Sequence, residues 1–283
     1  LIDIPNAFIQ TRIENEEDMA IMKIRGVLVD MLLDIAPDVY QPFVTTDKKG
    51  TKQLVVQCQN AIYGTMVASL LYYRKFCKSL TSIGFVFNPY DPCVANQRVN
   101  GKQQTVTWHV DDLKSSHVDP KVNNEFYKWL EETYGSEELG HVTTTRGPIH
   151  DYLAMKLDYS TPGILKVDMR EYLSTMLTDF PYKLQGEVHV PWNEKLFKVG
   201  KTSKKLDNKR RETFYSFVMK AMFLCKRARS EVQPAISFLA SRVQEPTEGD
   251  WTKLVRVLVF LKTTKDDLLA LDADNTQTLK WYV

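Results

Sequence analysis

Hydrophobic and polar residues alternate over several short segments in the first 170 residues of the chain. Alternation with a period of two is typical of strands that bury one face. Turn-forming residues, such as Asp111-Asp112 and Pro162-Gly163, lie between these segments. The pattern predicts strands at residues 1–4, 19–24, 53–58, 105–110, 113–117, 152–159 and 164–168.

Helical spacing of hydrophobic residues predicts three helices in the same region. Pro5 favours a helix start because proline is preferred at the first helical position. Leu70, Tyr73 and Cys77 share one face of the second helix, and Gly135 closes the third. The predicted helices cover residues 6–14, 66–80 and 125–134.

From Arg170 onward the hydrophobic spacing is helical, and two one-sided stripes stand out. Such stripes are usually core, so no chemistry is assigned to them. The change of pattern near residue 165 predicts a domain boundary, residues 201–211 are interpreted as an exposed linker, and a last strand begins at residues 279–283. The stripes consist of Phe214, Phe217, Val218, Ala221, Met222 and Cys225, and of Trp251, Leu254, Val255, Leu258 and Val259.

Composition places the chain among soluble globular proteins. Of its 283 residues, 43% are hydrophobic and 25% charged, and no apolar run approaches membrane-spanning length. Collagen, bulk disorder and a membrane span are therefore excluded. The four cysteines form no CxxC pair, which argues against a disulfide scaffold or a zinc site and favours a reducing compartment. A start inside a strand, without a secretory signal, suggests a piece of a longer polypeptide.

Charge is unevenly distributed although the net charge is only +2. Residues 201–229 hold ten Lys or Arg against two acids. Such a basic block beside an acidic remainder is expected of a polyanion-binding arm next to a metal–carboxylate site. A solvated helix face explains the same charges equally well, so both readings stay open.

The segment His109-Val110-Asp111-Asp112 is the sharpest chemical feature. Adjacent carboxylates repel each other unless a cation compensates, and Asp-Asp is a poor two-residue hairpin turn. Strand alternation puts His109 and Asp111 on one face and Trp108 and Val110 on the other. If the apolar pair faces the core, Asp111 is a principal metal ligand and Asp112 a secondary one. A plain surface turn is the alternative.

Asp3 is the candidate for a further carboxylate, because it lies where a predicted strand ends. Carboxylates at the ends of neighbouring strands can bind two Mg²⁺ ions roughly 3.5 to 4 Å apart, the arrangement used for in-line phosphoryl transfer. Mg²⁺ prefers such hard oxygen ligands and takes others from water and substrate phosphates. An ordinary strand-end residue is the alternative interpretation of Asp3.

Five segments carry a resemblance to a known family, in the same order along nearly the whole chain. "LIDIPNAFIQTRI" resembles a catalytic Asp followed by x-x-(N/T)-A-F-L, and "NAIYGTMVASLLYYRKFCKSLTSIGFVFNPYDPCV" resembles an A-L-Y-G-L-K-Q-A segment that continues to Asp-Pro-Cys. "TWHVDDLKSS" corresponds to a Tyr-Val-Asp-Asp box, "HDYLAMKLDYSTPGILKV" to a Y-L-G-M hairpin, and the segment from "FYSFVMKAMFLCKRARSEVQ" to "FLKTT" to a following helical region. The chain thus resembles the reverse transcriptase region of copia-type retrotransposon polyproteins.

This resemblance implies an α+β fold and three domains. A polymerase palm with partial fingers would cover residues 1–165, a mostly helical thumb and connection residues 166–265, and a linker with the start of a truncated ribonuclease H-like domain residues 266–283. The implied function is RNA-directed DNA polymerisation, in which a nucleotide is transferred from a dNTP to a primer 3′-hydroxyl. A catalytically inactive nucleic-acid-binding remnant is the alternative, and a two-metal nuclease has less support.

Residue by residue, the resemblance makes Asp3, Asp111 and Asp112 the catalytic ligands of two Mg²⁺ ions. Phe8 matches the aromatic steric gate that rejects a 2′-hydroxyl, with Ile4 and Ala7 beside it at the nucleotide; a core residue on a helix face is the alternative for Phe8. The implied primer contacts are His109, Val110, Tyr152 and Met155.

Three departures from the family pattern bear on these assignments. His109 replaces the usual Tyr, Met66-Val67 replaces Lys-Gln, and Ala154 replaces Gly. The Met66-Val67 change removes a polar side chain expected near the nucleotide. Because the three acids and Phe8 are retained, the pattern favours a divergent polymerase over a decayed one.

A basic block is the best candidate for binding the nucleic-acid backbone, since such contacts follow phosphates and not base sequence. The expected partners are an RNA or DNA template with its primer, a dNTP, and other polyprotein segments such as integrase and ribonuclease H, with no membrane. The resemblance implies action inside cytoplasmic, intracellular virus-like particles. The block consists of Lys204, Lys205, Lys209, Arg210 and Arg211.

Overall fold

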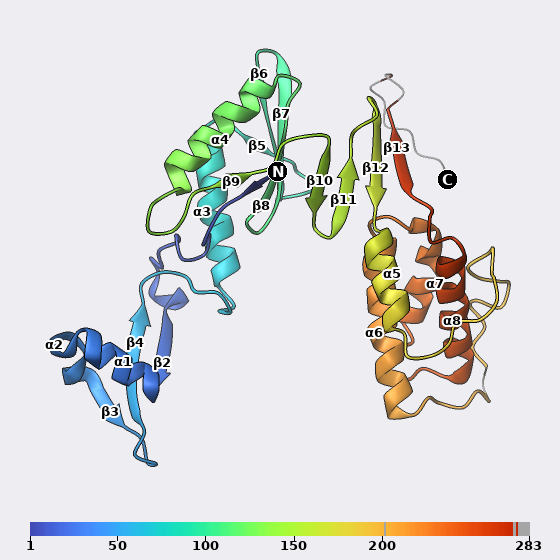
Figure 1. Ribbon diagram of the computed structural model, residues 1–283, viewed down its shortest axis with the longest axis horizontal. Helices are drawn as coiled ribbons and strands as arrows, with labels where there is room; N and C mark the ends of the chain where they lie inside the picture. Colours follow the sequence, from blue (N-terminus) through green and yellow to red (C-terminus); the bar gives the residue numbers. More distant parts are fainter. Residues whose placement is uncertain (201, 274–275, 277–283) are drawn as a thin grey trace. The chain divides into compact units, whose positions relative to one another are not determined.

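The computed structural model divides the chain into two compact units, Leu1–Thr145 and Arg146–Val283, each with its own sheets and helices (Figure 1). The structure describes all residues except 201, 274–275 and 277–283. Over the described residues it has three sheets and eight α-helices, a mixed α/β composition. None of the described helices is both long and apolar enough to cross a membrane.

The first unit is organised around a six-stranded antiparallel sheet with the order β5-β6-β7-β8-β1-β9. Helices α3 and α4 pack against it through a shared core that includes Phe76 of α3, Leu130 of α4 and Trp108 of β7. Asp119 caps α4 by accepting a hydrogen bond from the Lys121 backbone N–H at 2.9 Å. The elements are β1 (Ile2–Asp3), α3 (Ala68–Ser82), β5 (Val86–Phe87), β6 (Val94–Val99), β7 (Lys102–His109), β8 (Asp112–Ser116), α4 (Pro120–Tyr134) and β9 (Thr143–Thr144).

A smaller three-stranded sheet, of order β2-β4-β3, follows the first turn of the chain and carries two short helices. Only Val29, Leu54 and Cys58 are buried in these strands and helices, whereas side chains such as Ile21 and Ile35 are exposed. The elements are the 3₁₀ helix Glu16–Asp18, β2 (Ala20–Arg25), α1 (Val27–Ile35), α2 (Pro37–Tyr40), the 3₁₀ helix Gln41–Phe43, β3 (Val44–Thr46) and β4 (Lys52–Cys58).

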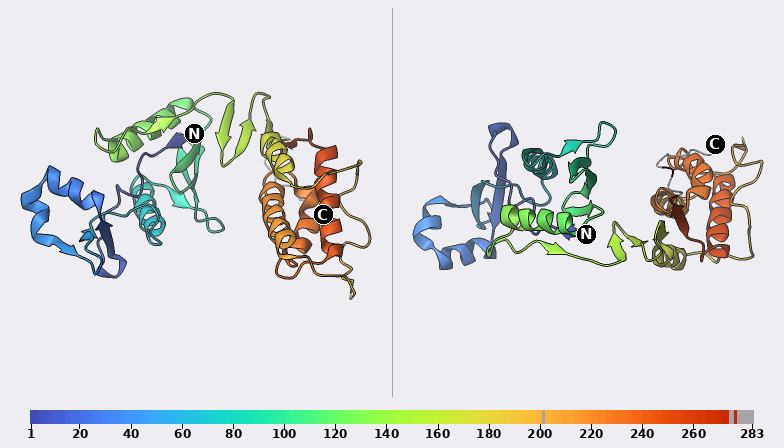
Figure 2. Two further views of the ribbon diagram at one scale, coloured as in Figure 1. Left: turned by 60° about the horizontal axis from the view of Figure 1, so that its bottom comes forward. Right: turned by 90° about the horizontal axis from the view of Figure 1, so that it is seen from above.

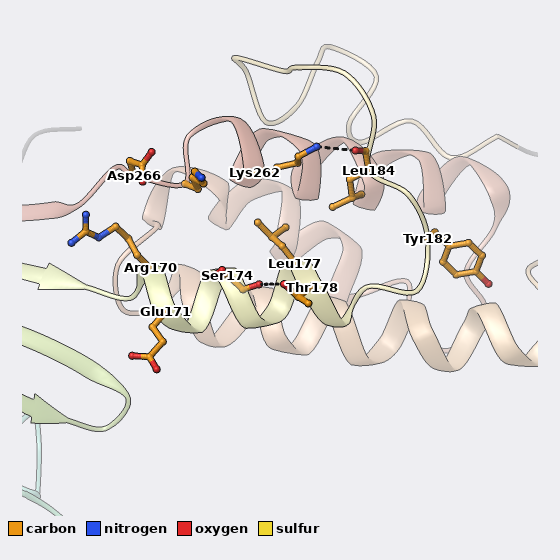
Figure 3. A pocket seen from close by; sticks show the side chains of 10 residues that line it. Arg170, Glu171, Ser174, Leu177, Thr178, Tyr182, Leu184, Lys262 and Asp266 are labelled. Atoms are coloured by element: carbon orange, nitrogen blue, oxygen red, sulfur yellow. Dashed lines mark hydrogen bonds between the residues drawn. The ribbon is translucent and has the colours of Figure 1, made fainter.

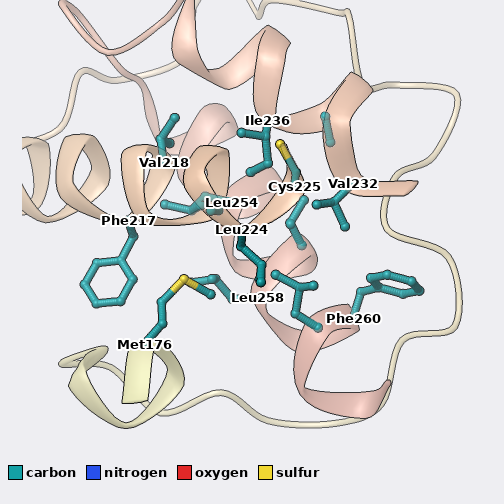
Figure 4. Packing of buried hydrophobic residues seen from close by; sticks show 14 of the residues in the cluster. Met176, Phe217, Val218, Leu224, Cys225, Val232, Ile236, Leu254, Leu258 and Phe260 are labelled. Atoms are coloured by element: carbon teal, nitrogen blue, oxygen red, sulfur yellow. The ribbon is translucent and has the colours of Figure 1, made fainter. Parts of the chain in front are cut away.

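The second unit combines a four-stranded antiparallel sheet, β10-β11-β12-β13, with a bundle of helices (Figure 2). Met176, Phe217 and Leu258 meet in its core, from α5, α6 and α8 respectively (Figure 4). The two predicted hydrophobic stripes face this core, except for half-buried Met222 and Val255 at its border and Val259, which is buried outside the cluster. The elements are β10 (Ile149–Tyr152), β11 (Met155–Asp158), β12 (Ile164–Asp168), α5 (Arg170–Asp179), α6 (Asn208–Cys225), the 3₁₀ helix Ser230–Val232, α7 (Gln233–Ala240), α8 (Glu248–Thr263) and β13 (Leu269–Asp272).

The observed boundary between the units differs from the expected one, lying after residue 145 instead of near residue 165. The reason is long-range strand pairing: β12 pairs with β13, which follows the helices, so the hairpins from Ile149 onward belong to the helical unit. The same pairing places Leu269–Asp272, within the expected linker of residues 266–283, in this sheet. The strand expected at residues 279–283 lies outside the described residues.

One local prediction near the N-terminus was wrong. Residues 6–14 form no helix but begin with turns, because Asn6 adopts a positive φ of 51° and its side-chain amide donates to the Leu139 carbonyl.

The helix predicted at residues 66–80 is present as α3. Its most buried residues include Leu71, Tyr72 and Phe76. Of the predicted face, Tyr73 and Cys77 are partly buried against the same core, whereas Leu70 is exposed.

Two helix starts also differ from prediction. Pro120 at the first position and the Asp119 cap start α4 five residues earlier than residue 125. The expected linker at residues 201–211 ends earlier, since α6 begins at Asn208 behind Asp207, whose side chain accepts from the Arg210 backbone N–H.

Candidate functional site: carboxylates at the β7–β8 hairpin

A strained two-residue turn presents the acidic segment. His109 pairs with Asp112, so Val110 and Asp111 form the turn between β7 and β8. Val110 has a φ of 58°, a conformation that is a clear outlier for a β-branched residue and that hairpins usually give to glycine. The turn was expected at Asp111-Asp112. Asp112 is instead the first residue of β8, and Asp111 occupies the turn.

Strand pairing brings Asp3 to this hairpin. Asp3 in β1 lies directly opposite Asp112 in β8, and the Ile4 backbone N–H donates to the Asp111 carbonyl at 3.4 Å. The neighbouring Ile2 and Leu113 are also paired and both are buried, which fixes the register of the two strands. The structure therefore brings the three predicted acids together where the interior strands β1 and β8 adjoin the hairpin turn, although Asp112 and not Asp111 is the direct partner of Asp3.

The electrostatics of this site follow from like charges placed together. The pKa of Asp3 is raised, first by burial and then by the negative charges of Asp111 and Asp112. Among the described residues, no Lys, Arg or His forms an ion pair with any of the three carboxylates. The repulsion is thus not relieved within the described part of the chain, and a bound cation would relieve it.

The three carboxylates match a divalent cation in their charge and in the type of donor atom. Carboxylate oxygens are the ligands that Mg²⁺ prefers, and Mg²⁺ usually takes one or two carboxylates, several waters and substrate phosphates instead of an all-protein cage. The described residues contain no group of three or more His, Cys, Asp or Glu side chains arranged to hold a metal ion. Asp3, Asp111 and Asp112 are therefore candidate ligands of a partly solvated cation, not a preformed cage.

Aromatic side chains adjoin the carboxylates. Phe8 is half-buried in the turn after β1, and its ring contacts Tyr63 at 4.5 Å and Tyr72 at 6.0 Å between ring centroids. Burial and then the charge of Asp111 are the main causes that raise the pKa of Tyr63, so its hydroxyl lies near the acidic site. The side chains of Ile4 and Ala7 are fully buried, which leaves only their backbones for the predicted nucleotide contact.

Tyr63 was not among the sequence-based candidates. It lies directly before Gly64 and three residues before Met66-Val67, whose side chains differ from the family pattern. Met66 is 97% exposed, whereas Val67 packs beside the small cluster of Ala61 and its neighbours. An aromatic residue ahead of a glycine was the signal that could have indicated Tyr63, but the ring pairing with Phe8 depends on the fold.

The predicted primer contacts are divided between the two units. His109 is exposed at the end of β7, next to Val110. Tyr152 and Met155 lie in the second unit, where they form the pair that flanks the β10–β11 turn. Leu153 and Ala154 in that turn both have positive φ, at 50° and 62°. Within the first unit the structure joins only His109 and Val110 to the carboxylates.

The basic block is partly neutralised. Lys205 forms an ion pair with Glu245 at 2.9 Å. Arg210 binds both carboxylate oxygens of Glu248 and stacks over the Trp251 ring at 4.4 Å. These two residues therefore have structural partners. The other three members, Lys204, Lys209 and Arg211, are exposed.

A cavity of about 600 Å³ lies in the second unit, away from every predicted site residue of that unit (Figure 3). Arg170 and Ser174 of α5 line one side and Lys262 of α8 the other, with Lys262 donating to the Leu184 carbonyl at 3.0 Å. Arg170 is held by a bidentate contact to Asp168. The lining mixes acids and bases, so it indicates no particular ligand.

Comparison with known proteins gives two distant relatives. The chain is 23% identical over 243 residues to the retrovirus-related Pol polyprotein from transposon TNT 1-94 of Nicotiana tabacum, covering 82% of this chain but 17% of that protein. It is 21% identical over 230 residues to a transposon Ty5-1 protein of Saccharomyces cerevisiae, covering 81% of this chain and 71% of that protein. The similarity supports an origin in a retrotransposon polyprotein.

No protein-family model matches the chain, and no solved structure matches it. The assignment of a polymerase palm to the first unit therefore remains a prediction. The same holds for the thumb and connection expected from the helices of the second unit.

Proposed function

We propose that the chain is the RNA-directed DNA polymerase segment of a copia-type retrotransposon polyprotein. The observation that carries the proposal is the meeting of Asp3 with Asp111 and Asp112, whose charges are unrelieved by any described base. The similarity to the Pol polyprotein of a transposon supports an origin in a retrotransposon. The first unit would be the palm, and the small sheet with β2, β4 and β3 would be part of the fingers.

In this proposal the three carboxylates hold two Mg²⁺ ions, which when bound would lower the pKa of the primer 3′-hydroxyl and neutralise charge on the departing pyrophosphate. Asp3 and Asp112 face each other across β1 and β8, so they would share the ions. His109 and Val110 would contact the primer end, and Phe8 would lie under the sugar of the incoming dNTP. Lys204, Lys209 and Arg211 would follow the template–primer backbone.

Primer extension tests the proposal. The chain is incubated with poly(rA)–oligo(dT), dTTP and Mg²⁺, beside Asp111→Asn and the control Glu132→Gln on the exposed side of α4. Extension by the wild type and the control, with near-complete loss in Asp111→Asn, is the expected result. Full activity of Asp111→Asn would refute the role of the carboxylates.

A nucleic-acid-binding remnant without activity is the second candidate. It is favoured by one observation, that the described residues hold no group of three acids arranged to grip a metal. The remnant predicts salt-dependent binding of the template–primer duplex without any extension. The same assay, combined with a binding measurement, therefore separates the two candidates.

The resemblance also supplies the setting of the proposed activity. The polymerase would act on a template–primer duplex together with integrase and ribonuclease H segments of the same polyprotein. It would do so in cytoplasmic virus-like particles. Co-purification of the chain with retrotransposon RNA in sedimenting particles is the measurement that checks this location.

A further inference from the structure

Phe8 contacts two tyrosines of different burial. Tyr72, on α3, is 1% exposed, with 6.0 Å between its ring centroid and that of Phe8. Tyr63 lies closer, at 4.5 Å with the rings inclined by 34°, and is 46% exposed. One contact is therefore part of the protein core, and the other lies at the surface.

The buried contact is continuous with the acidic hairpin. Tyr72 stacks on Phe76 at 5.9 Å and 15°, and Phe76 makes an edge contact with Trp108 at 5.3 Å. Trp108 immediately precedes His109 in β7. A chain of packed rings thus connects Phe8 to the strand that leads into the acidic hairpin, and packed interiors permit little movement.

Tyr63 makes the shortest ring contact of Phe8 among the described residues. Phe8 lies in a turn next to Asn6, which has positive φ, and not in a regular helix. Aliphatic packing against the cluster of Ala61, Ala68 and Leu71 also holds Phe8, and Tyr63 adds the contact that lies nearest the surface. Because a turn residue has no helical backbone to fix its direction, we expect the position of its ring to depend on such side-chain contacts.

We infer that Tyr63 is a specificity-determining residue: its ring holds Phe8 in place, so that discrimination between deoxyribose and ribose depends on the Phe8–Tyr63 pair and not on Phe8 alone. Tyr63 is a positioning residue in this account, acting through Phe8. The inference rests on the proposed function, which makes Phe8 the sugar gate. It assigns the effect chiefly to the ring of Tyr63, although the hydroxyl also lies near the backbone N–H groups of Phe8 and Ala7.

The test compares dTTP and UTP incorporation on poly(rA)–oligo(dT) by wild type, Tyr63→Ala, Tyr63→Phe and the control Tyr90→Ala, whose side chain is 95% exposed. Tyr63→Ala is expected to lower the ratio of dTTP to UTP efficiency roughly 2- to 12-fold, the range that corresponds to a measured aromatic pair energy. Tyr90→Ala should keep the wild-type ratio, and Tyr63→Phe should lose less than Tyr63→Ala because it retains the ring. An unchanged ratio in Tyr63→Ala would overturn the inference, as would an equal loss in Tyr63→Phe.

A double-mutant cycle shows whether Tyr63 acts through Phe8. In a Phe8→Ala background, Tyr63→Ala should change the ratio no further, since the ring that it positions is gone. An additional loss of the same size would assign Tyr63 a separate role and contradict the inference. Tyr63→Leu replaces Tyr63→Ala if the latter unfolds.

The aromatic NMR signals of ¹³C-labelled Phe8 provide a readout that needs no activity. Tyr63→Ala should shift the Phe8 ring signals and speed the ring's motion, whereas Tyr90→Ala should not. Failure of the wild type to incorporate any dTTP would refute the proposed function. The NMR measurement would then still test whether Tyr63 holds the Phe8 ring in place. Unchanged Phe8 signals would refute the packing claim whatever the activity.

Discussion

Neutralising Asp111 should stabilise the protein at neutral pH. Asp3 has a raised pKa in the folded state because of burial and the charges of Asp111 and Asp112. A carboxyl whose folded-state pKa is raised binds its proton more tightly when folded, so its ionisation costs stability. That cost is absent below the usual pKa of Asp and develops as the pH rises through the raised value. Asp111→Asn removes one source of the repulsion.

The magnitude can be bounded by that of a cross-strand pair. Like charges on neighbouring strands cost about 0.2–1 kcal/mol, and Asp111 acts on Asp3 from the turn beside Asp112. We therefore expect Asp111→Asn to gain about 0.5 kcal/mol at pH 7 and low salt, which is a rise of about 1–2 °C in Tm for a domain of this size. Salt should reduce the gain, because exposed charges are screened.

Thermal unfolding followed by circular dichroism is the assay, at pH 3 and pH 7 and at two salt concentrations. The gain should be present at pH 7 and largely lost at pH 3, because the raised pKa of Asp3 keeps this carboxyl mostly protonated there in the folded state. Glu132→Gln on the exposed side of α4 is the matched control and should not change the Tm. A Tm of Asp111→Asn equal to or below that of wild type at pH 7 would refute the argument that these carboxylates repel each other.

Three further predictions concern the second unit. Ala154→Gly should raise the free energy of unfolding by about 0.5–1 kcal/mol in a denaturant titration, because a positive φ of 62° strains alanine and not glycine. A loss of stability would contradict the strain. Arg229→Ala should lower the free energy of unfolding by about 2–3 kcal/mol, since the buried Arg229 donates to the carbonyl of Thr264 at 3.0 Å and to the Thr264 hydroxyl. A change below about 0.5 kcal/mol would show that these hydrogen bonds are not formed. Replacing Lys204, Lys209 and Arg211 together by Ala should reduce the slope of log affinity for template–primer against log salt by about 2–3. Lys205→Ala should leave this slope unchanged, because Lys205 is paired with Glu245. Equal slopes for both variants would contradict the separation of exposed from paired basic residues.

The strands that hold the candidate site could be predicted from the sequence. Alternation in β7 buries Gln104, Val106 and Trp108, and this local pattern was sufficient to place the hairpin. The exact turn was not predictable, because the positive φ of Val110 is imposed by the pairing of β7 with β8 and is contrary to the preference of the residue. Local patterns place strands, but tertiary pairing decides the conformation between them.

The remaining differences arise from contacts between distant parts of the chain. The unit boundary depends on the pairing of β12 with β13, and the partner of Lys205 is 40 residues away in the sequence. The contact between Phe8 and Tyr63 likewise joins a turn after β1 to a segment before α3. None of these pairs leaves a periodic signal, so residue spacing alone could not indicate them.

The central claim is that Asp3, Asp111 and Asp112 form one site for a divalent cation. The most direct test is the pKa of Asp3, measured by ¹³C NMR of its carboxyl carbon with and without Mg²⁺, in wild type and in Asp112→Asn. A cation held by the three acids predicts a marked fall of this pKa on adding Mg²⁺, and a smaller fall in the variant. An Asp3 pKa that is indifferent to Mg²⁺ would contradict the claim.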